Sequence, residues 1–342
     1  MRAVRVNAFG LDQVVVAEED RPAPAADEVL IRVLACSLNY RDVLVARGEY
    51  NPHYPLPLIL GSDCCGEIVE LGADAHASGL RVGDRVCPIF SRGWLTGSPT
   101  RNAVRNSLGG PLPGVFAELA VARADSVVVV PSTLDPLEAA CLPCAGVTAW
   151  SALATLGNVQ AGDVVLTIGS GGVSLFGIQL AGLLGARVIA TTRTPEKRAR
   201  LLALGAHEAL VTAGPGYGET VRRLAGGEGV DHVLEVGGVG TLPESLAAVR
   251  PGGTVSLIGV LAGGRGPVDL RPAVMRNVRL QGVFVGSRSS FEALLAAWLS
   301  RGLRPVIDTV YPLSRARDAF EHLASGRHFG KICLVPDEGS RG

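Results

Sequence analysis

The chain has 342 residues, 47% of them hydrophobic, and its 32 basic and 32 acidic residues give a formal net charge of zero. A chain of this length can form two domains, each with its own core. Zero net charge gives no overall attraction to nucleic acid or to an anionic membrane, and no apolar run approaches membrane-spanning length. We therefore expect neither nucleic acid nor a membrane among its partners.

The cysteines and the N-terminal sequence bear on the cellular compartment. The chain has seven cysteines, an odd number without the spacing of a disulfide framework, which indicates reduced thiols. The first ten residues, MRAVRVNAFG, lack the apolar core of a signal peptide. Both observations favour a cytoplasmic location.

Residues 1–130 have the pattern of a β domain. Short apolar runs are separated by turns that contain Pro or Gly. The expected strands include Glu28–Ala35, Gly66–Leu71, Asp84–Pro88 and Ser126–Val130. The segment Arg92–Pro113 predicts a long loop, and loops of this kind often determine which substrate an enzyme accepts.

Between residues 131 and 290 strands and helices alternate, which predicts an α/β domain with a mostly parallel, doubly wound sheet. The expected strands after the first two are His207–Val211, Val230–Val236, Thr254–Ile258 and Arg279–Val285, and the expected helices include Pro195–Leu204 and Leu242–Arg250. Residues 291–342 predict two helices and a closing strand, Lys331–Val335, that returns to pair with the N-terminal β domain.

One βαβ unit carries most of the functional information. A buried strand at Val164–Ile168 is followed by the turn Gly169-Ser170-Gly171-Gly172, a helix at Val173–Leu184 and a second strand at Arg187–Thr191. A glycine-rich turn in this position lays a dinucleotide pyrophosphate on a helix N-terminus. The alternative is an ordinary glycine turn in some other α/β protein.

The glycines of this turn have separate roles. Gly169 allows the tight turn, and Gly171 lets backbone N–H groups approach the phosphates without an intervening Cβ. Ser174 stands where G-x-G-x-x-G has its third glycine. A serine there still allows the helix to pack closely on the strand.

The end of the second strand indicates the cofactor. An NAD-binding fold usually has Asp or Glu there for the ribose 2′-OH, whereas this chain has no acid before Glu196. Arg193, with Thr192 and Lys197, can instead form charge-assisted hydrogen bonds to a 2′-phosphate. This favours NADP(H) over NAD(H). The alternative to a phosphate site is that Arg193, Lys197 and Arg198 are solvated side chains at the start of a helix.

Several motifs together resemble the medium-chain dehydrogenase/reductase superfamily, most closely its zinc-independent alcohol dehydrogenase and quinone oxidoreductase branch. The motifs are Asn39-Tyr40-Arg41-Asp42, Val82-Gly83-Asp84-Arg85-Val86, Cys144 to Trp150, Gly169 to Ser174, Glu235-Val236-Gly237-Gly238, Pro251-Gly252-Gly253 and His328-Phe329-Gly330-Lys331. The resemblance covers nearly the whole chain. It implies a GroES-like substrate domain (1–130, completed by 291–342), a Rossmann domain for the cofactor (131–290) and an active site in the cleft between them.

The metal ligands of the zinc-dependent members are mostly missing. Asn39 holds the position of the first cysteine, Gly61-Ser62-Asp63 replaces the GHE motif, and Cys144 alone remains. A catalytic zinc needs three protein ligands and an open position. The four clustered cysteines of a structural zinc lobe are also absent from the segment 91–113. We expect no zinc.

Without a Lewis acid, hydride transfer needs a proton donor or a substrate that tolerates negative charge. Enones and quinones have that tolerance, because hydride addition gives a delocalised anion. Candidate hydrogen-bond donors to the substrate oxygen are Asn39, Tyr40 and Tyr50, with Ser62 as a weaker candidate. Alternatively, Asn39 caps a helix that begins at Arg41 and Tyr40 only packs.

The resemblance also implies cofactor contacts. It places Thr148 and Val173 against the nicotinamide ring, and the residues at the ends of several strands border the same ring. Lys331 either reaches a phosphate of the cofactor or is a solvated lysine. The implied set beyond the glycine turn is Cys144, Thr148, Val173, Gly237, Gly238, Ile258, Gly259, Val260, Val285, Gly286 and Lys331. By analogy with the family, edge strands around Leu280–Val285 pair two copies into a homodimer.

Three functions remain open from the sequence. The first is an NADPH-dependent, metal-free reductase of quinones, enones or related carbonyl compounds. The second is an alcohol–ketone dehydrogenase in which a tyrosine gives the proton. The third is a nucleotide-binding protein without turnover, such as a redox sensor.

Overall fold

The computed structural model describes residues 1–212 and 214–337, so the end of the segment 291–342 lies outside the described residues. Contacts along the chain divide it into two compact units. Unit 1 contains Met1–Val147, Gly286–Ala297 and the chain from Arg304 onward, and unit 2 contains Thr148–Val285 and Trp298–Leu303.

The first division falls after Val147, whereas the sequence places it at residue 130. The reason is the packing of helix α2 (Pro136–Ala140), which lies against strands β3 (Glu28–Ser37) and β5 (Cys64–Leu71) of unit 1. The thiol of Cys87 contacts the carbonyl oxygen of Ala139 at 3.7 Å, within the same buried layer. The segment after residue 130 therefore extends the β domain before the nucleotide-type unit begins.

Unit 1 is built on two sheets. The larger has the order β15-β16-β3-β5-β6-β8, with β7 paired to β3, and the smaller has the order β2-β1-β4. Their remaining strands are β1 (Arg2–Val6), β2 (Val14–Glu18), β4 (Leu58–Ile59), β6 (Arg85–Pro88), β7 (Leu119–Arg123), β8 (Val127–Val129), β15 (Ile307–Pro312) and β16 (Lys331–Val335). The expected return of the closing strand is confirmed, because β16 pairs antiparallel with β3, with Cys333 opposite Ser37.

Three further helices belong wholly or mainly to unit 1. They are α1 (Tyr40–Ala46), α9 (Arg288–Ser300) and α10 (Ala316–Ala324). Helix α1 begins directly after β3, with Asn39 at its N-cap, and the carboxylate of Asp42 accepts the backbone N–H of Asn39 at 2.8 Å. The edge-to-face contact of Phe116 and Phe320, 6.3 Å between ring centroids, joins α10 to the core of the β domain.

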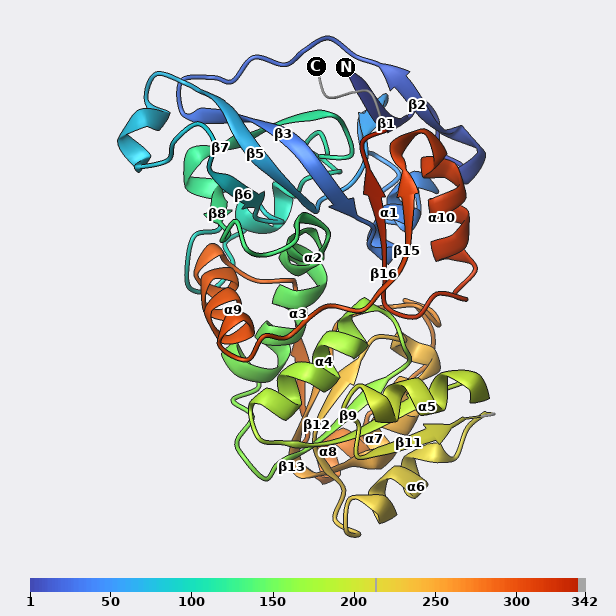
Figure 1. The fold of residues 1–342 in the computed structure, drawn as a ribbon. Coiled ribbons are helices and arrows are strands. Elements are labelled where there is room, and N and C mark those ends of the chain that lie inside the picture. The colour runs from blue at the N-terminus through green and yellow to red at the C-terminus, as the bar shows by residue number, and fades with distance from the viewer. Residues whose placement is uncertain (213, 338–342) are drawn as a thin grey trace. The chain divides into compact units, whose positions relative to one another are not determined.

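Unit 2 is a parallel sheet with the order β11-β10-β9-β12-β13-β14. Its strands are β9 (Val164–Ile168), β10 (Arg187–Thr192), β11 (Glu208–Val211), β12 (Val230–Glu235), β13 (Val249–Leu257) and β14 (Arg279–Gly282). Helices α4 (Gly172–Leu183) and α5 (Pro195–Ala203) lie in front of these strands in Figure 1. This strand order is that of the Rossmann fold, and the expected doubly wound sheet is confirmed.

Some predicted elements of unit 2 differ from the observed ones. Helices α6 (Tyr217–Leu224) and α8 (Arg271–Met275) were not expected from the sequence. Helix α7 (Leu242–Ala248) stops two residues short of the prediction because β13 begins at once with Val249. Strand β14 ends at Gly282 and not at Val285, whose φ of 45° is incompatible with a strand.

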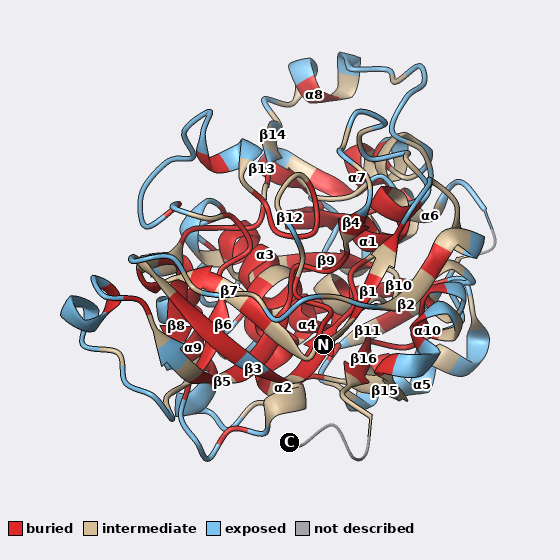
Figure 2. Ribbon diagram, turned by 90° about the horizontal axis from the view of Figure 1, so that it is seen from above, coloured by how far each residue is buried: buried red, intermediate tan, exposed pale blue. Residues whose placement is uncertain are grey.

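Burial follows this architecture. The strands β3 and β9 are buried, whereas α8 is largely exposed (Figure 2). In α8, Val274 and Met275 have exposed fractions of 73% and 81%. Over the described residues, no helix combines the length and the apolar character needed to cross a membrane.

Candidate active-site residues in the two units

In unit 1, the register of three adjacent strands brings polar residues together. Strand β3 lies between β16 and β5 and runs antiparallel to both, so its end meets the beginnings of its two neighbours. The amide of Leu38 donates to the carbonyl of Ile332 at 2.9 Å, and the amide of Ser37 donates to that of Asp63 at 3.1 Å. One step further along, this register sets Lys331 opposite Asn39.

The side chain of Asn39 is held at both its oxygen and its nitrogen. The Nζ atom of Lys331 donates to Oδ1 of Asn39 and to the carbonyl oxygen of Leu38, each at 2.6 Å. The Nδ2 atom of Asn39 lies 3.5 Å from Oγ of Ser62, which donates to Oδ1 of Asp63 at 2.7 Å. We call these four residues, Asn39, Ser62, Asp63 and Lys331, the polar cluster.

The polar cluster is buried, and burial dominates its electrostatics. Asp63 has no exposed surface and Lys331 has an exposed fraction of 3%. Burial raises the pKa of the Asp63 carboxyl, while the Lys331 ammonium and the hydrogen bonds from its neighbours oppose that shift. Nearby Asp42 is also fully buried, and desolvation raises its pKa to about 6, although Arg41 acts in the opposite direction.

The two candidate tyrosines differ in their surroundings. Tyr40 is the half-buried first residue of α1. Tyr50 has an exposed fraction of 39%, and the guanidinium of Arg41 lies 5.1 Å from its ring centroid. Arg41 also donates to the carbonyl of Leu108 at 2.7 Å, so it links Tyr50 to the loop expected at Arg92–Pro113.

Cys144 lies in a wide helical turn, Leu142–Gly146, at the edge of the polar cluster. Its backbone N–H donates to Oδ2 of Asp63 at 3.1 Å. Burial raises the pKa of its thiol, and the charge of Asp63 adds to the shift, so the sulfur stays protonated. Among residues 1–212 and 214–337, no three His, Cys, Asp or Glu side chains form a group that could hold a metal ion.

In unit 2, the glycine turn has the conformation that the sequence predicts. Gly169 has a φ of 81°, which a residue with a Cβ adopts only with strain. A Cβ added at Gly171 would meet nothing within 4 Å, so the space in front of the α4 N-terminus is open. The first backbone N–H groups of α4, from Gly172, have no acceptor within the helix and provide an anion site.

Ser174 and Gly177 share the function of the missing third glycine. The hydroxyl of Ser174 is buried and donates to the carbonyl oxygen of Ile168 at 2.7 Å, which ties α4 to the end of β9. A Cβ at Gly177 would lie 2.7 Å from Cδ2 of Leu234, a residue of β12. Close packing of this helix on the sheet therefore needs the glycine one turn later.

Arg193 follows the end of β10. Its side chain is exposed and has no hydrogen-bond or ion-pair partner among the described residues. Thr192 is buried and its Oγ1 accepts the backbone N–H of Thr194 at 3.1 Å, while the neighbouring Arg198 donates to the carbonyl of Ala209. Lys197 is half-buried and has a polar interaction of its own. Arg193 is thus the cation of this segment that remains available to a ligand.

A buried carboxylate organises the end of β12. One carboxylate oxygen of Glu235 accepts the backbone N–H groups of Gly237 (2.6 Å) and Gly238 (3.0 Å) and the hydroxyl of Thr241 (2.5 Å). The other accepts the hydroxyl of Ser245. The amides of Gly237 and Gly238 are therefore committed to Glu235 and are not available to a cofactor. Gly237 is buried, and only Gly238 is partly exposed.

The next strand ends are shaped by close backbone approaches. A Cβ at Gly259 would lie 2.5 Å from the carbonyl oxygen of Val236, so this position needs glycine. Ile258 is half-buried, and Val260 has an exposed fraction of 49%. The φ of 45° at Val285 is strained for a β-branched residue, and such strain is concentrated at functional sites.

The remaining predicted cofactor residues are accounted for individually. Thr148 has an exposed fraction of 4%, whereas Ser170 and Val173 are half-buried at the glycine turn. Gly286 is buried and is the first residue of unit 1 after Val285. Lys331 is not a solvated lysine, since its ammonium is buried against two oxygens of its own unit.

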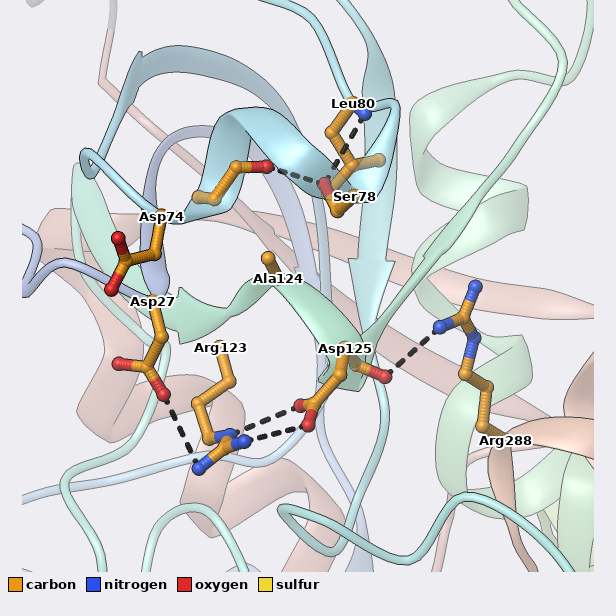
Figure 3. A pocket seen from close by; sticks show the side chains of 9 residues that line it. Asp27, Asp74, Ser78, Leu80, Arg123, Ala124, Asp125 and Arg288 are labelled. Atoms are coloured by element: carbon orange, nitrogen blue, oxygen red, sulfur yellow. Dashed lines mark hydrogen bonds and ion pairs between the residues drawn. The ribbon is translucent and has the colours of Figure 1, made fainter.

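A separate cavity of about 340 Å³ lies in unit 1 and is lined mainly by charged residues (Figure 3). Arg123 pairs with Asp125 at 2.7 Å and with Asp27 at 3.3 Å, and Arg288 donates to the backbone carbonyl of Asp125. Arg123 is thus paired with two carboxylates, and Arg288 is paired with that of Glu292 at 2.8 Å. Because both guanidinium groups are neutralised, we do not place the candidate active site there.

The fold and these residues define an oxidoreductase of the alcohol dehydrogenase and quinone oxidoreductase type. The family model described as "Alcohol dehydrogenase GroES-like domain" matches residues 25–132, and that described as "Zinc-binding dehydrogenase" matches residues 172–301. The chain belongs to the medium-chain dehydrogenase/reductase superfamily, as its motifs suggested.

Individual relatives span almost the whole chain. A zinc-type alcohol dehydrogenase-like protein of Schizosaccharomyces pombe is 37% identical, over 96% of both proteins. A quinone oxidoreductase of Sus scrofa is 31% identical, over 98% of both. A mycobacterial protein solved in complex with NADPH has a TM-score of 0.85 and 28% identity, covering 98% of this chain and 99% of that one.

Three features of these sites were not expected from the sequence. They are the contact of Lys331 with Asn39, the burial of Asp63 and the hydrogen bonds of Glu235. The hydrogen bonds of Glu235 were indicated by its place at the end of the apolar run Val230–Glu235. A carboxylate that is buried with such a run must accept hydrogen bonds from nearby donors.

Proposed function

We propose that the protein is a zinc-independent, NADP(H)-dependent oxidoreductase that transfers hydride between the nicotinamide and a quinone, an enone or another carbonyl or alcohol substrate. The observation that carries this proposal is the exposed Arg193 after β10, which has no polar partner within residues 1–212 and 214–337 and lies in the same unit as a glycine turn with open space in front of its helix. When bound, the nicotinamide supplies the hydride.

The preference for NADP(H) follows from charge. The Arg193 guanidinium can form two parallel hydrogen bonds to a 2′-phosphate, and the segment Arg193–Pro195 contains no carboxylate that would repel it. The α4 N-terminus would hold the pyrophosphate. The NADPH bound in the mycobacterial relative is consistent with this preference.

Zinc independence follows from the donor set of the polar cluster. A zinc ion at this place would need Asn39, Ser62 or Asp63 and Cys144 as ligands. The Lys331 ammonium already contacts Oδ1 of Asn39, which puts a positive charge where the metal would lie, and the thiol of Cys144 stays protonated. These residues do not fit zinc, so no step of the reaction is assigned to a metal.

Substrate activation then depends on hydrogen-bond donors. Hydride addition to the β carbon of an enone moves an electron pair onto the carbonyl oxygen, where an N–H or O–H donor stabilises the charge. Asn39, Tyr40 and Tyr50 are the candidate donors in unit 1. An enone or quinone delocalises the negative charge, so it needs less stabilisation from these hydrogen bonds than a saturated ketone does.

The test is NADPH oxidation with a conjugated enone and its saturated ketone, each in the presence of a metal chelator. Oxidation with the enone but not with the ketone supports the proposal. Equal turnover of the ketone would favour an alcohol dehydrogenase in which Tyr40 or Tyr50 donates the proton. NADPH binding without oxidation by any acceptor would favour a redox sensor.

The cofactor preference has its own test. Arg193→Ala is expected to weaken NADPH binding by about 10–100-fold, the value of a lost charge-assisted pair, and to leave NADH binding nearly unchanged. Arg301→Ala is the matched control, because it removes another exposed guanidinium of unit 2 for which the described part of the chain offers no polar partner. Equal losses for NADPH and NADH would contradict the assignment.

We also propose a homodimer with a small-molecule substrate as its other partner. Strand β14 is an open edge of the unit 2 sheet. Leu270, Val274 and Met275 next to it have exposed fractions of 51% to 81%. Light scattering coupled to gel filtration should give twice the mass of the chain, and a monomer mass would contradict this proposal.

A further inference from the structure

Lysine is rare in this chain, and one of its two lysines is buried. Of the 32 basic residues only Lys197 and Lys331 are lysines, and the other 30 are arginines. Lys331 has an exposed fraction of 3%. Burying an ammonium group is unfavourable unless it is hydrogen-bonded to oxygens of the protein. A chain that otherwise uses arginine keeps a compact ammonium here, between the carbonyl of Leu38 and Oδ1 of Asn39.

The chemistry of the ammonium fixes the orientation of the Asn39 amide. An ammonium has three donors and no acceptor, so the Asn39 atom 2.6 Å from it must be the oxygen. The amide nitrogen therefore points to the opposite side, where Nδ2 lies 3.5 Å from Oγ of Ser62. A flipped amide would put its N–H groups against Nζ and is excluded by repulsion.

The same order continues beyond Asn39. The Ser62 hydroxyl accepts from Nδ2 and donates to Asp63. In this row of hydrogen bonds every donor therefore points from the Lys331 cation toward the Asp63 anion. Hydrogen bonds aligned in this way polarise one another. The backbone of Asn39 is fixed as well, because its N–H is bound by Asp42.

We propose that Lys331 is a positioning residue for the reaction: it holds the Asn39 amide so that Nδ2–H, and not Oδ1, is presented to the oxygen of the carbonyl substrate. This inference rests on the proposed function. One Nδ2 hydrogen points toward Ser62, the Asn39 side chain also hydrogen-bonds Asp63, and Asn39 keeps an exposed fraction of 8%.

The consequence for the reaction is a donor of defined direction. Hydride addition forms a C–H bond at the β carbon. The C=C π pair then joins the α carbon to the carbonyl carbon, the C=O π pair moves onto the substrate oxygen, and the resulting enolate receives its proton from water. The nicotinamide is oxidised and the substrate is reduced. Nδ2–H stabilises the oxygen while it is negative, whereas Oδ1 in the same place would repel it.

The activity test is a double-mutant cycle of Lys331→Met and Asn39→Ala, with kcat for an enone and the Kd for NADPH measured separately. Each single variant is expected to lower kcat about 100-fold, as for loss of one oxyanion donor, with the NADPH Kd changed less than twofold. The double variant should be no slower than Asn39→Ala. Additive losses would overturn the proposal, and a tenfold weaker NADPH affinity in Lys331→Met would show that Lys331 binds a cofactor phosphate.

A second pair of variants separates positioning from folding. Asn39→Asp keeps an oxygen against Lys331 and so preserves the buried contact, but it has no N–H to present. It is expected to keep its thermal unfolding midpoint and to be as slow as Asn39→Ala. Lys331→Gln retains an uncharged donor to Oδ1 and should recover part of the rate lost in Lys331→Met. Full activity of Asn39→Asp, or no recovery with Lys331→Gln, would overturn the proposal.

A spectroscopic readout tests the contact without turnover. Protein labelled with ¹⁵N-lysine has two side-chain signals, and Lys197→Arg identifies that of Lys331. The Lys331 ammonium signal is expected to be protected from solvent exchange and to shift in Asn39→Ala. An unshifted signal would overturn the proposal even if the enzyme is active. A shifted signal in a protein that oxidises no NADPH would locate the failure in the proposed function instead.

Discussion

The buried carboxylate of Glu235 gives a prediction whose magnitude follows from its hydrogen bonds. Glu235→Ala removes the acceptor of two backbone N–H groups, those of Gly237 and Gly238, and of two hydroxyls. The hydroxyls of Thr241 and Ser245 can rotate toward other acceptors, but the amides cannot. A buried donor left unsatisfied costs about 1–3 kcal/mol.

The expected loss in the free energy of unfolding is therefore about 3–5 kcal/mol for Glu235→Ala. Glu235→Gln keeps one acceptor oxygen for the two amides and should lose about half as much. The assay is urea unfolding followed by circular dichroism, with NADPH affinity as a second readout, because the turn after β12 is a predicted cofactor contact.

Glu228→Ala is the matched control, since Glu228 is exposed and has no polar partner among the described residues. It should change the free energy of unfolding by less than about 0.5 kcal/mol. If Glu235→Ala were as mild as this control, the hydrogen bonds of Glu235 would not hold the turn and the reasoning would be refuted.

Three more predictions concern stability. In helix α4, Gly182→Ala should stabilise the protein by about 0.5–1 kcal/mol, because the added Cβ meets no atom within 4 Å. Gly177→Ala should destabilise it, because the added Cβ would lie 2.7 Å from Leu234. A higher thermal unfolding midpoint in both variants would contradict this. Ser174→Ala should lower the free energy of unfolding by about 1 kcal/mol, because the hydrogen bond to the end of β9 is lost, and Ser174→Gly should lower it more. Urea unfolding midpoints equal to that of the wild type would contradict this prediction. Burial raises the pKa of Asp42 from 3.8 to about 6, so this group contributes stability that is present below pH 4 and lost as the pH rises through 6. In Asp42→Asn the thermal unfolding midpoint should depend less on pH over that range. The same pH dependence in the variant and the wild type would contradict the assignment.

Much of unit 2 was predictable because its determinants are local. The run Val164–Ile168 is an observed strand with the predicted bounds, and the glycine turn and α4 follow it as expected. A β-branched apolar run, a glycine at positive φ and an apolar helical stretch each act over a few residues. For the same reason the closing strand Lys331–Val335 has the predicted bounds. The short α8 was missed because five residues carry too little periodic pattern to indicate a helix.

The candidate site in unit 1 depended on tertiary structure. The sequence identified Asn39 from its motif, with capping of a helix as the alternative to a donor role, and the structure shows Asn39 at the N-cap of α1 with its N–H bound by Asp42. It gave Lys331 as a phosphate ligand or a solvated side chain, because lysines are usually exposed. The pairing register of β16 with β3 joined residues 292 positions apart in the chain and buried that ammonium against Asn39. Register is set by the packing of whole strands against a core, so no local pattern determines it.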